Sequence, residues 1–378
     1  MTLLEVLFAI LVTTVGLLGA IALLPVASSQ ARKGRINDAT AVHGPSAFHR
    51  FDTEGMRRPD RWMYWDTANS RFQMFGFPFF GQSFCIDPRL IAANGTANGL
   101  ATNAFPYSPT PALPGPRMQR LTLYSGTNVQ VPPPNNFPLP MSKLLADSVF
   151  TFDDDLIYTR PDDESLQASA VAGVGWDTLP TGGAISKRQS EGHMSWLATL
   201  VPKLDRYTPT DMTSTDQFIL SLVVFYDRPA DLTVGDAVAE RLLHVVTPMA
   251  GGGTTGGEVQ LRSATADGLK LRPNDWIMLA GATIHPDLNP IMSGLQPGPV
   301  NVFKWYRVSS CDPEIDAAGG FYFRYVTLFG QDWDTTLFNP YGNATGTPLT
   351  DPNPQQYPQA VVVEGVVGVY EKTIRLEQ

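Results

Sequence analysis

Residues 1–31, MTLLEVLFAILVTTVGLLGAIALLPVASSQA, decide the architecture of this chain. Glu5 is their only ionisable side chain, and residues 3–26 are almost wholly apolar before a basic cluster follows at 32–35. As a helix that rises about 1.5 Å per residue, the apolar run would span roughly 36 Å, which exceeds a hydrocarbon core of roughly 30 Å. The stretch therefore predicts a helix that can cross a membrane or fill the core of an assembly.

The order of charges in this stretch is not that of a cleavable signal peptide. Such a peptide begins with basic residues and ends in small ones, whereas here an acid comes first and the basic residues follow the apolar run. An unpaired carboxylate in an apolar segment costs several kcal/mol. The α-ammonium of Met1 is a suitable partner for Glu5, on the same chain or on a neighbour packed one step along an assembly. Pairing with a neighbour would set the register between subunits.

The sequence Met-Thr-Leu-Leu-Glu-Val-Leu-Phe-Ala-Ile-Leu-Val (1–12) resembles the mature N-terminus of type IV pilins and type II secretion pseudopilins. The resemblance implies that a prepilin peptidase removes a short leader, that Met1 is the processed and N-methylated residue, and that Glu5 guides assembly of a helical filament. The likeness covers little more than the N-terminal helix. An ordinary single-span anchor is the alternative for this segment.

On this resemblance we expect a structural subunit of a type IV pilus-like filament at the cell surface. Its partners would be further copies of itself, the inner membrane that anchors it before assembly, the prepilin peptidase and the pilus assembly machinery. The alternative is a minor pilin or pseudopilin that primes a filament, or lies at its tip, in a pilus or a type II secretion system.

Two prolines bear on the length of the helix. Pro25 lies within the apolar run and removes a backbone hydrogen bond, so it predicts a kink or a local loss of helix. Gly44-Pro45 predicts the end of the helix. We therefore divide the chain into an N-terminal helix, residues 1–44, and a globular domain, residues 45–378.

The globular domain carries the pattern of a β-protein. Its second half contains short apolar runs, most of them bounded by Gly, Pro or Asp, as strands are. They lie at 196–201, 218–226, 241–246, 258–261, 275–279, 302–308 and 321–328. The C-terminal run 360–376 predicts one long strand or a hairpin bent at Gly365 or Gly368. The expected class is α+β: a long hydrophobic helix that carries a large, mostly antiparallel β-domain, with two β-layers as one arrangement.

Two stretches of the domain have an unusual composition. Residues 102–140 contain ten prolines, which predicts a long surface excursion in extended conformation. It could lie across a neighbouring subunit or form an ordered loop on its own subunit. Residues 62–80 are rich in aromatic side chains. These side chains could bind a sugar or a peptide, which would indicate a membrane-anchored binding module or enzyme. A simpler interpretation is that the rings pack where the helix meets the domain.

The sequence contains no recognisable catalytic motif. The net charge of −9 argues against nucleic-acid binding. The five histidines lack metal-ligand spacing, no Gly-x-Ser-x-Gly is present, and the run Gly251–Gly257 lacks the lysine of a phosphate-binding loop. That run reads as the turn of a hairpin. We predict that the protein is not an enzyme and needs no cofactor.

Three weaker signals remain. Cys85 and Cys311 are the only cysteines, and in an oxidising compartment they would form a disulfide, with two free buried thiols as the alternative. An acidic segment offers Asp153, Asp154 and Asp155 as ligands for a structural Ca²⁺, although its spacing is not that of an EF-hand and a solvated acidic loop is simpler. Asn94-Gly-Thr and Asn343-Ala-Thr match the N-glycosylation pattern, which also arises by chance.

Overall fold

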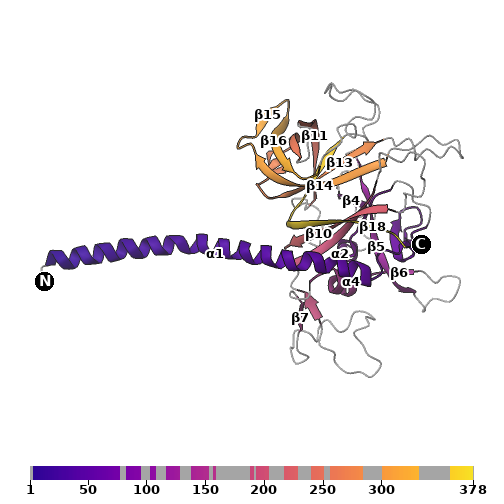
Figure 1. The fold of residues 1–378 in the computed structure, drawn as a ribbon, viewed down its shortest axis with the longest axis horizontal. Coiled ribbons are helices and arrows are strands. Elements are labelled where there is room, and N and C mark those ends of the chain that lie inside the picture. Colours follow the sequence, from indigo (N-terminus) through magenta and orange to yellow (C-terminus); the bar gives the residue numbers. More distant parts are fainter. Residues whose placement is uncertain are drawn as a thin grey trace.

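The computed structural model describes residues 3–76, 82–94, 103–107, 116–127, 138–152, 156–158, 188–190, 193–203, 217–228, 240–250, 256–283, 300–331 and 358–377. Within these ranges a single long helix projects from a β-rich body, so that the N-terminus lies far from the rest of the chain (Figure 1). The predicted α+β class is confirmed. Strands predicted from the second half of the sequence are present as β9 to β14 and β16.

The helix, α1 (Leu3–Thr53), is longer than predicted. It passes through Pro25 and Pro45 without interruption, and Figure 1 shows a gradual curve. The predicted loss of helix at Pro25 is wrong, because one proline removes one hydrogen bond and does not end a helix that continues on both sides. The predicted helix end at Gly44-Pro45 is also wrong: Ala47 and Phe51 are fully buried, and their burial holds the last turns in place.

Gly44 serves packing rather than helix termination. A Cβ at this position would overlap the ring of Tyr370, which lies directly against the helix there. The Tyr370 hydroxyl donates to the Thr40 carbonyl oxygen at 2.8 Å. The glycine therefore lets a strand of the body approach the helix backbone closely.

Nine strands of the described chain form the first sheet. Its central order is β18-β10-β9-β3-β5-β1-β2, with β4 and β6 also paired to β5. Every pair is antiparallel except β3 with β5. The strands are β1 (Trp62–Asp66), β2 (Arg71–Met74), β3 (Phe84–Ile86), β4 (Ala104–Phe105), β5 (Met118–Thr127), β6 (Pro138–Pro140), β9 (Met194–Pro202), β10 (Gln217–Tyr226) and β18 (Val366–Arg375). A separate pair is formed by β7 (Leu156–Tyr158) and β8 (Arg188–Ser190).

The second sheet closes on itself. Its order is β12-β11-β17-β13-β14-β16, and β12 also pairs with β16, so these strands form a closed antiparallel barrel, with β15 added beside β16. Closure removes the open edges that an isolated sheet would expose. The strands are β11 (Glu240–Ala250), β12 (Gly257–Ser263), β13 (Trp276–Thr283), β14 (Val300–Cys311), β15 (Asp316–Ala318), β16 (Phe321–Phe329) and β17 (Gln359–Val363). The predicted hairpin around residues 251–257 is confirmed by the β11–β12 pairing, although the tip at 251–255 lies outside the described residues.

The C-terminal run is neither one strand nor a hairpin. β17 belongs to the barrel and β18 belongs to the first sheet, and the chain crosses between them at Gly365. Gly365 has φ +82° and its carbonyl accepts the Tyr226 N–H at 2.7 Å. The close approach to the β10 end and the positive φ both require a glycine. The bend predicted at Gly365 exists, but it joins two sheets.

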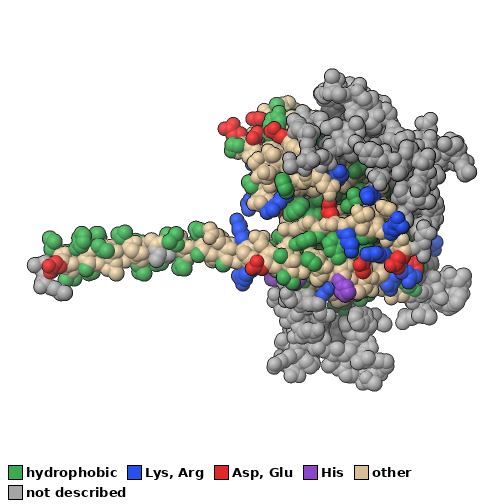
Figure 2. Space-filling model, in the orientation of Figure 1, with side chains coloured by type: hydrophobic (Ala, Val, Ile, Leu, Met, Phe, Trp, Pro, Cys, Tyr) green, Lys and Arg blue, Asp and Glu red, His purple; other side chains and the backbone are tan. Residues whose placement is uncertain are grey.

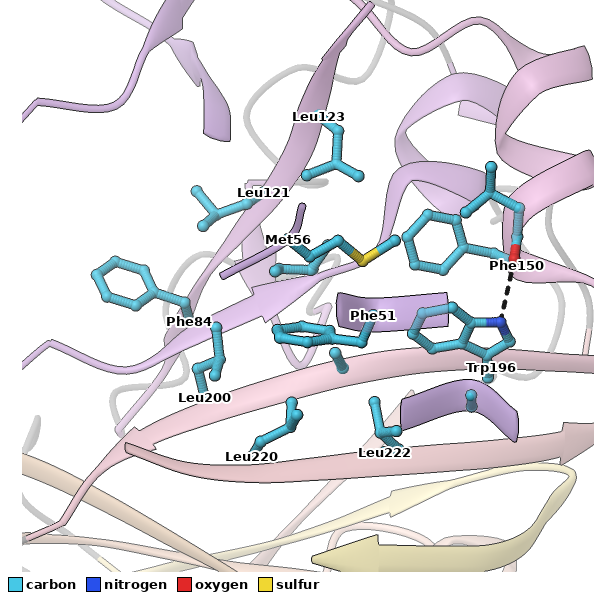
Figure 3. Close-up of a cluster of buried hydrophobic side chains, with 14 of the residues drawn as sticks. Phe51, Met56, Phe84, Leu121, Leu123, Phe150, Trp196, Leu200, Leu220 and Leu222 are labelled. Atoms are coloured by element: carbon cyan, nitrogen blue, oxygen red, sulfur yellow. Dashed lines mark hydrogen bonds between the residues drawn. The ribbon is translucent and has the colours of Figure 1, made fainter. Parts of the chain in front are cut away.

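Both faces of the first sheet are covered, which explains why β9 is buried along its whole length. One face packs against the end of α1 and against α4 (Lys143–Phe150) around the cluster in Figure 3, where the Trp196 indole donates to the Val149 carbonyl oxygen at 3.2 Å. The other face packs against the outer wall of the barrel through Leu197, Phe225 and Trp305. Three short helical elements complete the described body: the helix α2 (Pro88–Asn94) and the 3-10 turns η1 (Pro59–Arg61) and η5 (Ala266–Leu269).

Described parts of both stretches of unusual composition contribute to the core. Within 102–140, β5 lies in the middle of the first sheet and Leu121 is fully buried, so the predicted surface excursion is wrong for residues 116–127. Trp62 is also fully buried, donates to the Met56 carbonyl oxygen at 2.9 Å and packs its ring against Phe75. The simpler interpretation of the aromatic stretch, rings packed where helix and domain meet, is confirmed for these residues; 77–80 lie outside the described part.

Candidate functional site

The first half of α1, residues 3–26, is the most unusual surface of the molecule. It carries 15 of the 23 large apolar side chains that are exposed in the described structure, from 46% exposed at Val6 to 82% at Leu3. Apolar side chains cover this half of the helix in Figure 2. A helix on the surface of a globular protein has one apolar stripe, and a helix that is apolar all round requires burial all round. This segment is long and apolar enough to cross a membrane, so it could serve as an anchor.

The polar side chains on this stretch are compatible with an apolar environment. The four described hydroxyl groups between residues 13 and 29 donate to carbonyl oxygens of the helix itself. The pairs are Thr13 with Ala9, Thr14 with Ile10, Ser28 with Pro25 at 2.9 Å, and Ser29 with Val26 at 2.9 Å. Because each donor is satisfied within the helix, burial in lipid or among other helices leaves no hydroxyl unpaired.

Glu5 is the one charged side chain on this stretch. It lies in the first turn of α1 and is exposed. The partial positive charge of a helix N-terminus favours a carboxylate at this place. Met1 lies outside the described residues, so the pairing of Glu5 with its ammonium group stays a prediction.

The second half of α1 is fixed to the body. The His43 ring stacks on Phe152 with centroids 4.3 Å apart, and the Arg50 guanidinium donates to the Thr151 carbonyl oxygen at 2.8 Å. With Ala47 and Phe51 fully buried, these contacts hold the helix in the first core. The exposed half is therefore the free arm of a helix whose other half is docked.

A surface cluster marks the place where α1 leaves the body. Arg32 donates to the Tyr226 hydroxyl at 3.2 Å and to Asp227 at 3.4 Å, and its guanidinium lies 5.2 Å from the centre of the Tyr226 ring. His193 Nδ1 lies 2.5 Å from the other Asp227 oxygen and stacks on the same tyrosine ring. The side chains are about half exposed, so each contact is weak by itself. Together they brace the helix at the edge of its exposed half.

Four buried charged side chains connect the first sheet to the barrel. They form an interlayer ionic cluster: Asp87 after β3, Arg120 on β5, Arg228 after β10 and Glu240 at the start of β11. None of these side chains is more than 5% exposed. Arg228 contacts Asp87 at 2.7 Å and Glu240 at 3.2 Å, and Arg120 contacts both acids as well.

The charges of this cluster balance, which makes their burial tolerable. Burial alone would raise the pKa of Asp87, but Arg228 and Arg120 outweigh it and hold that pKa at about 2. Burial alone would lower the pKa of Arg120, but Glu240 and Asp87 raise it. The cluster is complete without a ligand, so we assign it to the joining of the two layers and not to binding. Sequence analysis missed it because its members come from four separate segments.

The two cysteines do not form the predicted disulfide; both are free. Cys85 on β3 is buried between the first sheet and the barrel, whereas Cys311 ends β14 and packs against the barrel interior. The two thiols thus belong to different cores. The alternative of two free buried thiols is correct in that both are free, but only Cys85 is buried, and Cys311 is half-buried. Burial raises the pKa of the Cys85 thiol, so it is a poor nucleophile.

The remaining predicted site residues lie outside the part of the chain that the structure describes. Asp153, Asp154, Asp155 and Asn343 lie outside the described residues, as does the side chain of Asn94, the last residue of α2. In the part of the chain that the structure describes, no group of three or more His, Cys, Asp or Glu side chains could hold a metal ion. The calcium and glycosylation predictions therefore stay predictions.

Comparison with known proteins gives no family for this chain. No protein-family model matches it, and neither a curated protein nor a solved structure does.

Proposed function

We propose that this chain is a structural subunit of a type IV pilus-like extracellular filament, which polymerises through residues 3–26 of α1. The observation that supports this best is the free arm of α1, apolar on every side and braced on a folded body. In a filament the arms of neighbouring copies would bundle and bury one another, and the β-rich bodies would form the outer surface. Before assembly the same arm would lie in the inner membrane.

The exposed apolar surface of the arm is large enough that it would not stay in water. If burial of each of the 15 exposed apolar side chains of the arm contributes about 1 kcal/mol, the total is about 15 kcal/mol. The loss of translational and rotational freedom on association costs about 4–15 kcal/mol. Relative to exposure to water, burial of the arm is therefore at least comparable to this cost.

Glu5 would give the assembly its direction and spacing. A bilayer already solvates the apolar side chains, so exclusion of water alone does not drive them from membrane to filament. A carboxylate, however, is costly in a bilayer and is relieved when it meets a cation. The N-terminal ammonium group of a neighbouring copy would provide that cation, and the pair would form only at one axial offset.

The test compares Glu5→Ala with Asp38→Ala. Both variants remove one carboxylate from α1, but Asp38 lies beyond the apolar arm. In cells that make the protein, we expect abundant filaments in sheared material from the wild type and from Asp38→Ala, and few or none from Glu5→Ala, as seen by electron microscopy. Normal filaments from Glu5→Ala, or membrane-bound wild-type protein without filaments, would refute the proposal, the second result in favour of a simple anchor.

Mass spectrometry of the same filaments tests the remaining parts of the proposal. A methylated Met1 as first residue would be the product of prepilin peptidase processing. Copy number separates a major subunit from a minor pilin or pseudopilin: the chain should dominate the filament in the first case and be present in traces in the second.

A further inference from the structure

The outer wall of the barrel carries a row of exposed aromatic side chains on β16. Beyond α1, seven large apolar side chains are exposed in the described chain, and three of them are Phe321 (39%), Tyr325 (37%) and Phe329 (62%). Phe323, half-buried, lies between the first two. These odd-numbered residues share the outward face, since Val326 and Leu328 face the barrel core. We call this surface the β16 aromatic face.

Polar side chains from the adjacent strands stand beside these rings. In an antiparallel sheet, residues directly opposite each other point to the same face. The opposite residues are Arg262 and Asp316 for Phe323, Gln260 for Tyr325, Glu258 for Thr327 and Arg307 for Phe329. The Arg262 guanidinium also lies 4.7 Å from the centre of the Phe321 ring, and its Nε has no hydrogen-bond partner in the described structure.

The charges on the β16 aromatic face cancel. Glu258 and Asp316 balance Arg262 and Arg307, so the face has no complementarity to a strongly charged polymer. A typical protein partner would require a continuous apolar centre with charges confined to the rim. Here a carboxylate, an amide or a guanidinium lies beside nearly every ring.

We propose that the β16 aromatic face binds an extended, uncharged polysaccharide. Aromatic rings pack against the apolar C–H faces of sugar rings, while carboxylate, amide and guanidinium groups hydrogen-bond to sugar hydroxyls. Side chains on alternate residues of one strand lie about 6.8 Å apart in a straight row, which suits an extended chain better than a single small ligand. Because α1 docks on β10 and β18 of the first sheet, this function is compatible with polymerisation through the free arm.

The test is affinity electrophoresis of the full chain in lauryldimethylamine oxide, a detergent without a sugar group. The gels contain hydroxyethylcellulose, glucomannan or laminarin as uncharged probes, and alginate as a charged probe. We expect retardation by at least one uncharged polysaccharide and little by alginate. No retardation by any of the three, or stronger retardation by alginate, would overturn the proposal.

Matched variants locate the binding surface. Tyr325→Ala and Phe329→Ala should each weaken binding about five- to tenfold, since each removes one stacking ring. Leu139→Ala removes an apolar side chain of similar exposure (41%) from β6 and should bind like the wild type, as should Phe329→Tyr, which keeps the ring. Circular dichroism confirms that each variant is folded. Unchanged binding by both alanine variants on β16 would overturn the assignment.

Two further measurements separate this proposal from its rivals. If the face instead binds a second copy of the chain, Phe329→Ala will lower the sedimentation coefficient of the detergent-solubilised protein and polysaccharide will have no effect. Failure of the filament proposal can be distinguished from failure of the polysaccharide proposal, because Glu5→Ala should still bind polysaccharide and Phe329→Ala should still form filaments. Loss of polysaccharide binding in Glu5→Ala would place the site on the arm and contradict the proposal.

Discussion

Replacing Asp87 by Asn tests whether balanced charge makes the interlayer ionic cluster tolerable. The variant removes one of two carboxylates from a site that holds two guanidinium groups, with the Asp87 side chain 1% exposed. The depression of its pKa from 3.8 to about 2 corresponds to about 2 kcal/mol of folding stability. Leaving a buried charge uncompensated costs about 3–5 kcal/mol. We therefore expect a loss of about 2–5 kcal/mol.

Urea unfolding of the full chain in detergent, followed by tryptophan fluorescence, measures this loss. The control Asp316→Asn removes a charge from an exposed side chain on β15 and should change stability by less than about 0.5 kcal/mol. The double variant Asp87→Asn/Arg228→Met restores the charge balance and should recover part of the loss. A loss below about 1 kcal/mol for Asp87→Asn, or no recovery in the double variant, would refute the reasoning.

The same variant gives a pH test with a definite sign. A carboxyl group whose pKa is lower in the folded than in the unfolded state stabilises the fold above its unfolded pKa, and this contribution is lost as pH falls through the folded pKa. For Asp87 the window runs from about pH 4 down to about pH 2. The wild type should lose about 2 kcal/mol more than Asp87→Asn between pH 5 and pH 2. Parallel pH profiles would contradict the pKa assignment.

Two further predictions concern packing and thiol chemistry. Gly44→Ala should lower the free energy of unfolding by about 1–3 kcal/mol, because the new methyl group meets the Tyr370 ring. The same substitution should be nearly harmless in a Tyr370→Ala background. Thermal unfolding of the two single variants and the double variant checks this. Native protein treated with iodoacetamide at pH 8 should be alkylated at Cys311 before Cys85, since burial raises the pKa of the Cys85 thiol and excludes the reagent. Denatured protein without reductant should be alkylated at both cysteines, as measured by mass spectrometry. Cysteines that stay unmodified after denaturation would indicate a disulfide.

The long N-terminal helix could be predicted because its signal is local. An apolar run with one acid at position 5 fixes a helix whatever follows it, and the alternation of the later strands is similarly local. The predicted end at Gly44-Pro45 failed for a non-local reason: the burial of Phe51 and the fit of Tyr370 against Gly44 outweigh the cost of a proline. Local sequence propensity thus predicted that a helix forms here, and tertiary packing decided how far the helix extends.

The Pro-rich and C-terminal stretches show the same division. The prolines around β5 suggested an exposed loop, yet residues 118–127 form a central strand, because this segment contains no proline and pairs with β1 and β3, which come from earlier in the chain. The C-terminal valines correctly indicated strands, but which sheet each strand joins depends on partners far away in sequence.

Sequence alone determined that this protein has a long apolar N-terminal helix with an acid near its start and a β-rich remainder, because side-chain periodicity and charge order are properties of neighbouring residues. Only the tertiary structure decided that the strands form a closed barrel on a covered sheet, that Asp87, Arg120, Arg228 and Glu240 meet between these layers, and that the rings of β16 stay outside. Decisive pairs, such as Arg120 with Glu240 and Arg228 with Asp87, join residues more than a hundred positions apart, so they form only when distant parts of the chain fold together.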